Sequence, residues 1–269
     1  MRNLLAAGLR RLVKGRVFLL VLLSELAYTA LVVLVCWDHY AAGTGHYTLE
    51  SILTAGFGLM GYLPIPSLIA APLLCIHLGT EYSDNTLRNK LIAGHTRLSV
   101  YLADLLSCAA AALGLDLLYL ILAGSLCVYP VLSSAGRLLS APPGMALAWI
   151  AVGLLARAAW ASVIVLAATV LGSRTSAAIA GLLLVVAASL VCAVSFHEIE
   201  YLSRHLDAMD REIRLALWQL AVDALPTGQY LQISRLDTPN LWRLPLLSLA
   251  VAAGSTGIGA ALFQRKDLR

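Results

Sequence analysis

A charge-free run of 20 residues decides the fold: Ala177-Ala-Ile-Ala-Gly-Leu-Leu-Leu-Val-Val-Ala-Ala-Ser-Leu-Val-Cys-Ala-Val-Ser-Phe196. As a helix, a run of about 20 residues crosses the roughly 30 Å hydrocarbon layer of a bilayer. Comparable intervals recur at 17–36, 52–78, 100–129, 145–171 and 244–263. Because an unsatisfied peptide group in lipid costs several kcal/mol, we expect every interval to be helical. The sequence therefore predicts an all-α polytopic membrane protein, with six transmembrane helices in a single domain over 1–269.

Composition supports this class. Hydrophobic residues make up 60% of the chain, charged residues 13%, and the mean hydropathy is +0.83. An ordinary soluble domain has about 45–50% apolar and about 25% charged residues. The sequence does not show the alternation of apolar and polar residues that is typical of membrane β-barrels, so helices are favoured over strands.

The distribution of basic residues predicts the orientation. Twelve of the 19 Lys and Arg residues fall in the N-terminal segment, in 80–98, in the turn after the fourth span or at the C-terminus. Basic loops stay on the cytoplasmic side of a membrane. We therefore expect a multi-pass protein of a bacterial-type cytoplasmic membrane, with both termini in the cytoplasm. Segment 1–16 is predicted to be an amphipathic interfacial helix that contacts membrane lipid. A cleaved signal peptide is the alternative, but the apolar run is long and no cleavage site follows it.

The region 197–243 is predicted to be external and helical. Apolar residues from Phe196 to Leu220 recur every three or four positions, with charged residues between them, which indicates an amphipathic surface helix. Such a helix either rests on the outer leaflet or caps the exit of a pathway. Segment 215–233 carries Asp223 as its only charge, and re-entry into the membrane is left open.

Several kinds of chemistry lack their motifs. The three lysines, Lys14, Lys90 and Lys266, do not follow glycine, so a Walker A loop is excluded. A Gly-x-Ser-x-Gly nucleophile elbow is also missing. The five cysteines lie in or beside apolar spans without a CxxC pair, and we interpret them as buried small side chains. We therefore expect no enzymatic activity, no cofactor or metal bound by this chain, and no nucleic-acid partner.

The polar segment 80–98 separates the second and third spans. Gly79 can end the span, Ser83, Asp84 and Asn85 are residue types that begin helices, and Gly94 can stop one. The intervening residues give about two helical turns, with Leu87, Leu91 and Ile92 on one apolar face. A short helix lying across the cytoplasmic surface is predicted.

A family resemblance rests on this segment. The chain reads Glu81-Tyr-Ser-Asp-Asn-Thr-Leu-Arg-Asn-Lys-Leu91, then Gly94-His-Thr-Arg97, then Tyr101-Leu-Ala-Asp-Leu-Leu106. These motifs resemble the permeases of ABC-2 type transporters, as do Leu225-Pro-Thr-Gly228 and the terminal Phe263-Gln-Arg-Lys-Asp-Leu268. Asn85 and Asp104 depart from the glycine and lysine that are common in that family.

The resemblance implies that 80–98 is a coupling helix, which fits a cleft in a separate nucleotide-binding ATPase subunit. ATP and magnesium would be bound by that partner. A second permease subunit, identical or closely related, would complete a pathway for an amphipathic peptide, lipid or similar cargo. The implied coupling residues are Glu81, Tyr82, Asp84, Asn85, Thr86, Leu87, Arg88, Asn89 and Leu91. The alternative is that these residues merely cap and solvate a loop.

Four charges fall within the predicted spans: Glu25, Asp104, Asp116 and Arg157. Each costs about 2.5–3.5 kcal/mol on insertion scales, so we expect all four to face protein or water. Asp116 and Arg157 lie at similar depth, which predicts a buried pair, whereas Asp104 can reach the cytoplasmic interface. A contact of Glu25 or Arg157 with cargo is the other reading.

Two further classes of function stay open. A secondary transporter would have inverted repeats and broken helices, and the proline-rich second interval hints at a break. A non-transporting regulatory or assembly subunit would use the same spans without a cargo.

Overall fold

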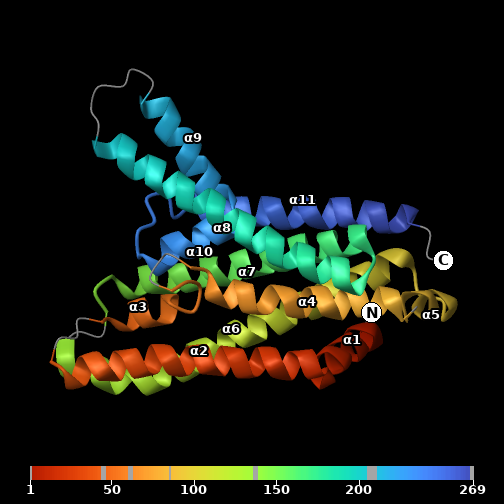
Figure 1. Ribbon diagram of the computed structural model, residues 1–269, viewed down its shortest axis with the longest axis horizontal. Coiled ribbons are helices and arrows are strands. Elements are labelled where there is room, and N and C mark those ends of the chain that lie inside the picture. Colours follow the sequence, from red (N-terminus) through yellow and green to blue (C-terminus); the bar gives the residue numbers. More distant parts are fainter. Residues whose placement is uncertain are drawn as a thin grey trace.

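The computed structural model describes residues 2–43, 47–59, 63–84, 86–135, 139–204 and 211–266. Most of these residues are in helices, as Figure 1 shows. The helices are α1 (Arg2–Lys14), α2 (Arg16–Ala41), α3 (Leu49–Thr54), α4 (Ile65–Ser83), α5 (Thr86–Ile92), α6 (Arg97–Ala135), α7 (Pro143–Leu171), α8 (Arg174–Arg204), α9 (Arg211–Ala224), α10 (Pro226–Ser234) and α11 (Arg243–Arg265).

Six of these helices are long and apolar enough to cross a membrane, namely α2, α4, α6, α7, α8 and α11. They run side by side along the long axis of the molecule (Figure 1). The predicted all-α polytopic membrane protein is thus confirmed. Five of the six predicted intervals lie within longer helices, because helical hydrogen bonding continues past the apolar run.

The second predicted interval, 52–78, is wrong in its first part. The short helix α3 ends at Thr54, and α4 begins only at Ile65. Pro64 and Pro66 explain the break, since a residue before proline is kept out of the helical region and proline itself lacks a donor. The Leu59 amide donates to the Leu63 carbonyl at 2.8 Å and closes the turn between the two helices.

Helices α4 and α7 form the centre of the bundle. Helix α7 packs against α4, α6, α8 and α11, and α4 also packs against α2. Small residues allow the closest approach: a Cβ on Gly181 would lie 2.2 Å from the sulfur of Cys75, and one on Gly79 would lie 2.5 Å from the Cα of Arg174. Close packing through glycine therefore joins α4 to α8.

Both termini and α5 lie at the same end of the bundle (Figure 1). The turn at Gly172, which has φ of +63° and ends α7, lies at this end of the bundle too. It is next to the side chain of Lys266, which follows α11. The segments that the sequence assigned to one side are therefore together in space. Helix α1 buries Leu4 and Leu12 against the rest of the protein, while Val13 stays 52% exposed.

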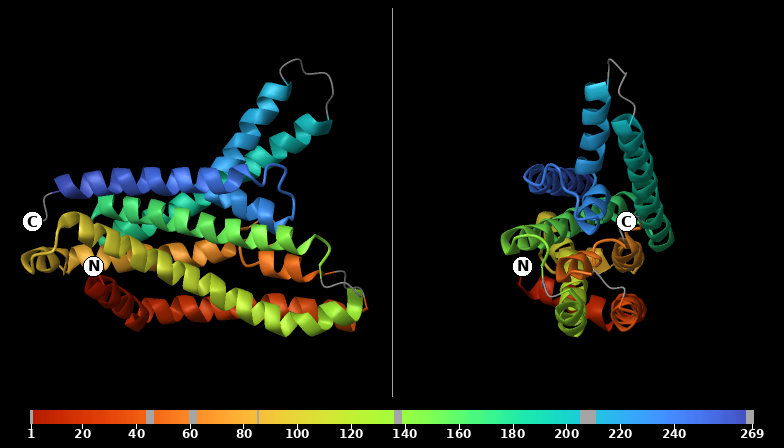
Figure 2. Two further views of the ribbon diagram at one scale, coloured as in Figure 1. Left: turned by 180° about the vertical axis from the view of Figure 1, so that it is seen from behind. Right: turned by 90° about the vertical axis from the view of Figure 1, so that its left-hand side faces the viewer.

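The region after the fifth span, which we predicted to be external, differs from the single surface helix that we expected over 196–220; residues 205–210 lie outside the described residues. No glycine or proline occurs between Gly181 and Pro226, and α8 continues through Phe196 to Arg204. Figure 2 shows the end of α8 and the helix α9 rising away from the bundle as a hairpin. Pro226 then starts α10, which is buried along most of its length and packs against α7, α8 and α9. Segment 215–233 thus folds back onto the bundle as two short helices.

Candidate functional site

Helix α5 is attached to the end of α4 by a local hydrogen bond. Asp84 ends α4, Asn85 lies outside the described residues, and α5 begins at Thr86. The Thr86 hydroxyl donates to the Glu81 carbonyl at 3.0 Å. Gly94 ends the segment with φ of +88°, a conformation that glycine adopts without strain. The predicted short helix is confirmed.

One face of α5 is packed against the bundle. Leu87 is buried and Leu91 is half-buried against the core, as the apolar pattern predicted. Ile92 was assigned to the same face and is instead 73% exposed. At 3.6 residues per turn, Ile92 is rotated well away from both leucines, which explains the error.

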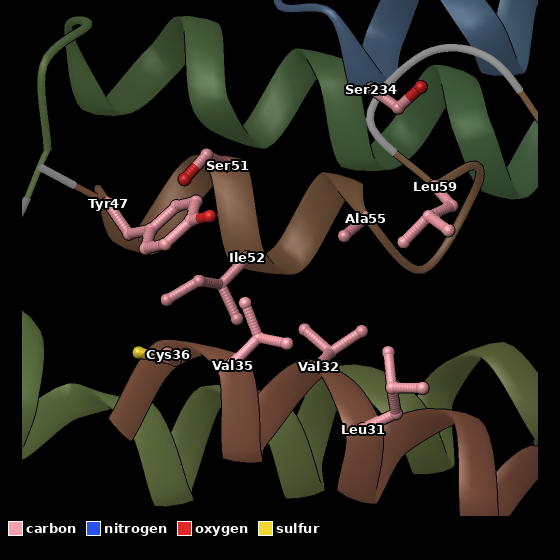
Figure 3. A pocket seen from close by; sticks show the side chains of 10 residues that line it. All are labelled: Leu31, Val32, Val35, Cys36, Tyr47, Ser51, Ile52, Ala55, Leu59 and Ser234. Atoms are coloured by element: carbon pink, nitrogen blue, oxygen red, sulfur yellow. The ribbon is translucent and has the colours of Figure 1, made fainter. Parts of the chain in front are cut away.

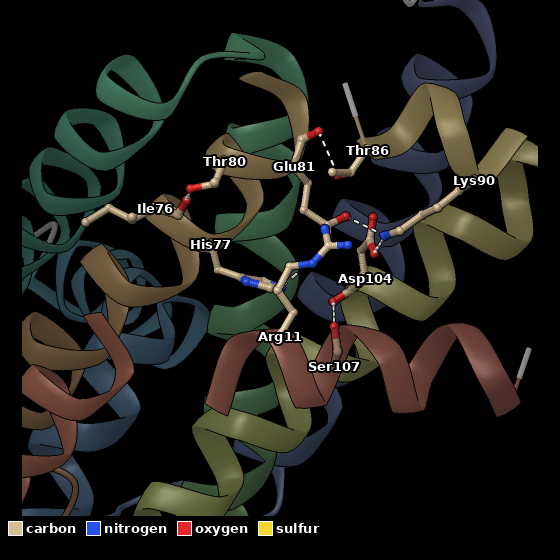
Figure 4. A network of polar contacts seen from close by, with 9 residues as sticks. All are labelled: Arg11, Ile76, His77, Thr80, Glu81, Thr86, Lys90, Asp104 and Ser107. Carbon is tan, nitrogen blue, oxygen red and sulfur yellow. Dashed lines mark hydrogen bonds and ion pairs between the residues drawn. The ribbon is translucent and has the colours of Figure 1, made fainter. Parts of the chain in front are cut away.

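Four charged residues from four helices meet beside α5 (Figure 4). Glu81 of α4 is buried and accepts hydrogen bonds from Arg11 of α1, at 3.1 Å, and from Lys90 of α5. The Lys90 ammonium also donates to Asp104 of α6 at 2.8 Å. His77 lies at the edge, with its Nε2 atom 4.0 Å from the Glu81 carboxylate. We call Arg11, Glu81, Lys90 and Asp104 the charged joint.

The charged joint is electrostatically balanced, with two carboxylates and two cations. Burial alone lowers the pKa of Lys90, but attraction to Asp104 and Glu81 outweighs it and raises that pKa above 10.5. Lys90 therefore stays charged near neutral pH. Charge-assisted hydrogen bonds of this kind are stronger than neutral ones, so α5 is held firmly to α4 and α6.

The opposite face of α5 is open to solvent. Asp84, Arg88, Asn89 and Ile92 are exposed at the end of the bundle. Glu81 and Leu87, which the resemblance assigns to partner contact, point inward and anchor the helix instead. Asn85 lies outside the described residues, and the other eight implied residues divide into an anchoring group and an exposed group.

The C-terminal end of α11 is tied to the same region. Tyr82 is half-buried, with its ring edge-on to Phe263 and with the Lys266 ammonium 4.7 Å from its centroid. Lys266 also donates to the carbonyls of Thr169 and Val170 at the end of α7. Cations stabilise helix C-termini, where carbonyls lack partners.

Arg97 completes this tie. Its Nη1 atom donates to the carbonyls of Phe263, Gln264 and Lys266, the last at 2.6 Å. Sequence reasoning missed the roles of Arg97 and Lys266, although each is a cation next to a helix end, which is a usable signal.

The buried pair within the spans is confirmed. Arg157 donates from Nε and Nη2 to both oxygens of Asp116, at 2.8 and 2.7 Å, and from Nη1 to the Ser67 hydroxyl at 3.0 Å. The Tyr230 ring lies 5.1 Å from the guanidinium carbon. Ser67 and Tyr230 had no signal in the sequence, because only the packing of α4 and α10 brings them there.

Glu25 also faces the protein interior, as we expected of a charge within a span. Its side chain is 2% exposed, and its Oε1 atom lacks a hydrogen-bond partner among the described residues. The Thr29 hydroxyl bonds only to the Glu25 carbonyl, at 2.8 Å.

Within the described ranges, His, Cys, Asp and Glu side chains do not gather into a metal-binding group, and the five cysteines are buried and free. Comparison with known proteins gives no assignment: no protein-family model matches the chain, and a search of curated proteins returns no match.

Proposed function

We propose that this protein is the membrane permease subunit of an ATP-driven transporter of the ABC-2 type. A separate nucleotide-binding subunit would dock on α5, bind ATP and magnesium, and hydrolyse the nucleotide. The termini and α5 would then face the cytoplasm of a bacterial-type cell. The excess of basic residues on that side supports this orientation.

One observation carries the proposal: α5 is anchored on one face and exposed on the other. Within the charged joint, Lys90 bonds α5 to α4 and α6, and Arg11 bonds α1 to α4, while Arg88, Asn89 and Ile92 face outward. A force applied to the exposed face would move α4 and α6 with α5, because charge-assisted bonds resist separation. A helix that only capped a loop would not need ionic contacts to two neighbouring helices.

The transport pathway would need a second permease subunit beside this one. Helices α8 and α11 carry many exposed apolar residues, among them Leu183, Leu190, Leu246 and Ile258. These faces suit either lipid or a partner helix. An amphipathic cargo follows from the family resemblance.

The docking role is tested by charge reversal on the exposed face. Arg88→Glu combined with Ile92→Asp should abolish copurification of a Walker A-bearing ATPase with the chain and leave membrane insertion unchanged. Leu87 is unsuitable for this test because its substitution would disturb the core. The matched control is Arg243→Glu, which reverses an exposed arginine at the start of α11.

Two results would contradict the proposal. One is undiminished copurification of the ATPase with the double variant. The other is cross-linking that places α5 on the outside of the cell. Transport by the purified chain without a nucleotide-hydrolysing companion would favour a secondary transporter.

A further inference from the structure

A cavity of about 330 Å³ lies between α2 and α3, at the end of the bundle away from the termini (Figure 3). Four residues from successive turns of α2 form one wall, and the opposite wall includes one residue of α3 and the residue that caps the C-terminal end of α3. They are Leu31, Val32, Val35, Cys36, Ile52 and Ala55. Figure 3 shows the two sets of side chains facing one another across the space.

The lining has no charged side chain, and two of its three hydroxyl groups donate within the protein. The Ser51 hydroxyl donates to the Thr48 carbonyl at 2.7 Å, and the Ser234 hydroxyl donates to the Leu231 carbonyl at 3.2 Å, which leaves the Tyr47 hydroxyl as the third. A charged ligand would lose its hydration without gaining a partner of opposite charge. The cavity therefore suits a hydrocarbon.

Hydrogen bonds from other parts of the protein fix the position of α3, which forms part of one wall of the cavity. The Tyr28 hydroxyl of α2 donates to the Ala55 carbonyl at 2.6 Å, and the Tyr119 hydroxyl of α6 donates to the Ile52 carbonyl at 2.7 Å. At the other end of α3, the Glu50 carboxylate accepts from the Ser140 amide at 2.9 Å. Because these bonds fix α3, the space is preformed and does not depend on a ligand.

One of the lining residues on α2 also lies on the outer surface of the bundle. Leu31 lines the cavity and is still 50% exposed, and its neighbour Leu34 is 68% exposed. The volume of the cavity lies at the low end of the range of about 300–1,000 Å³ for ligand pockets. A cavity of this size suits one acyl chain and not a whole lipid molecule. We propose that this cavity binds one acyl chain of a membrane phospholipid, entering laterally from the adjacent leaflet.

This inference does not rest on the proposed function, because an acyl chain can occupy the cavity whether or not an ATPase docks on α5. The test uses the purified full-length chain in phosphatidylcholine vesicles, with a photoactivatable diazirine on one acyl chain of the lipid. After illumination, labelled residues are mapped by mass spectrometry. We expect labelling to concentrate on the cavity side of α2 and on α3, above the background at the exposed residues Leu20 and Leu23.

A blocking variant makes the test specific. Ala55→Trp fills the cavity and should abolish the excess labelling, whereas Leu34→Trp adds the same ring on the exposed side of α2 and should preserve it. Val35→Phe blocks the opposite wall and serves if Ala55→Trp shows altered thermal unfolding or size-exclusion behaviour. Labelling at background level in the wild-type chain, or excess labelling that survives blockade by a folded variant, would overturn the proposal.

Discussion

The charged joint and the Asp116–Arg157 pair use the same kinds of side chain in different surroundings. In the pair, both side chains are 3% exposed and one cation meets one anion with two hydrogen bonds. In the joint, two cations share two carboxylates, and the side chain of Arg11 is 48% exposed while that of Lys90 is 13% exposed. The first site is closed within the bundle, and the second lies at its edge.

This difference indicates two roles for ionic contacts between helices. A buried pair with complete hydrogen bonding fixes α6 against α7, and breaking it leaves an uncompensated charge. The joint links four helices, and its central members Glu81 and Lys90 each have two partners, so either can lose one partner and retain another. We infer that the pair supports the fold and that the joint transmits movement of α5.

The largest expected effect comes from breaking the pair. Arg157→Met leaves Asp116 buried without its partner and should cost about 3–5 kcal/mol in the free energy of unfolding. Detergent-induced unfolding followed by circular dichroism measures the loss. The double variant Asp116→Leu with Arg157→Met should recover much of it, and a double variant no more stable than the single one would contradict this account.

A smaller loss is expected at the joint. Glu81→Gln removes one carboxylate, while Lys90 keeps Asp104 and Arg11 turns to water, so the cost should be about 1.5–3 kcal/mol. The same unfolding measurement tests it. Glu200→Gln is the control, because Glu200 forms an exposed pair with Arg204 and should change stability by less than about 0.5 kcal/mol. If the two variants lost the same free energy of unfolding, the charged joint would contribute no more to stability than an exposed ion pair.

The tie between α11 and α7 should be weaker again. Lys266→Met removes a cation from the carbonyl end of α7 and from the Tyr82 ring, and we expect a loss of about 1 kcal/mol. Lys14→Met, at an exposed position of α1, provides the comparison and should change stability little. A loss of unfolding free energy as large as that of Arg157→Met would contradict this prediction, because it would mean that the Lys266 contacts contribute as much as the buried pair.

The smallest effect concerns pH. The pKa of Lys90 is raised in the folded protein, so its stabilising contribution is complete below the unfolded value of about 10.4 and is lost as the pH rises through the folded value. The difference in unfolding free energy between wild type and Lys90→Met should therefore shrink as the pH rises above about 10. A difference that falls already near pH 8 would mean that the joint does not hold the proton on Lys90.

Part of the site could be predicted because it depends on local patterns. Gly94, Leu87 and Leu91 follow from helix ends and helix periodicity, and the depth of Asp116 and Arg157 in their spans predicted their pairing. The inward direction of Glu81 could not be predicted, since it depends on where α1 and α5 pack. Pro64 and Pro66 indicated the break before Ile65, but we predicted one span over 52–78 because the interval is long and carries no charge.

The sequence alone determined that this is an all-α membrane protein with six long apolar helices and a short polar helix between the second and third. Those properties follow from run length and from backbone hydrogen bonding, which are set residue by residue. Only the tertiary structure decided which charges meet, because Arg11 and Glu81 are 70 positions apart and Asp116 and Arg157 are 41 apart. At such separations the choice of partner depends on how the helices pack, which no local pattern contains.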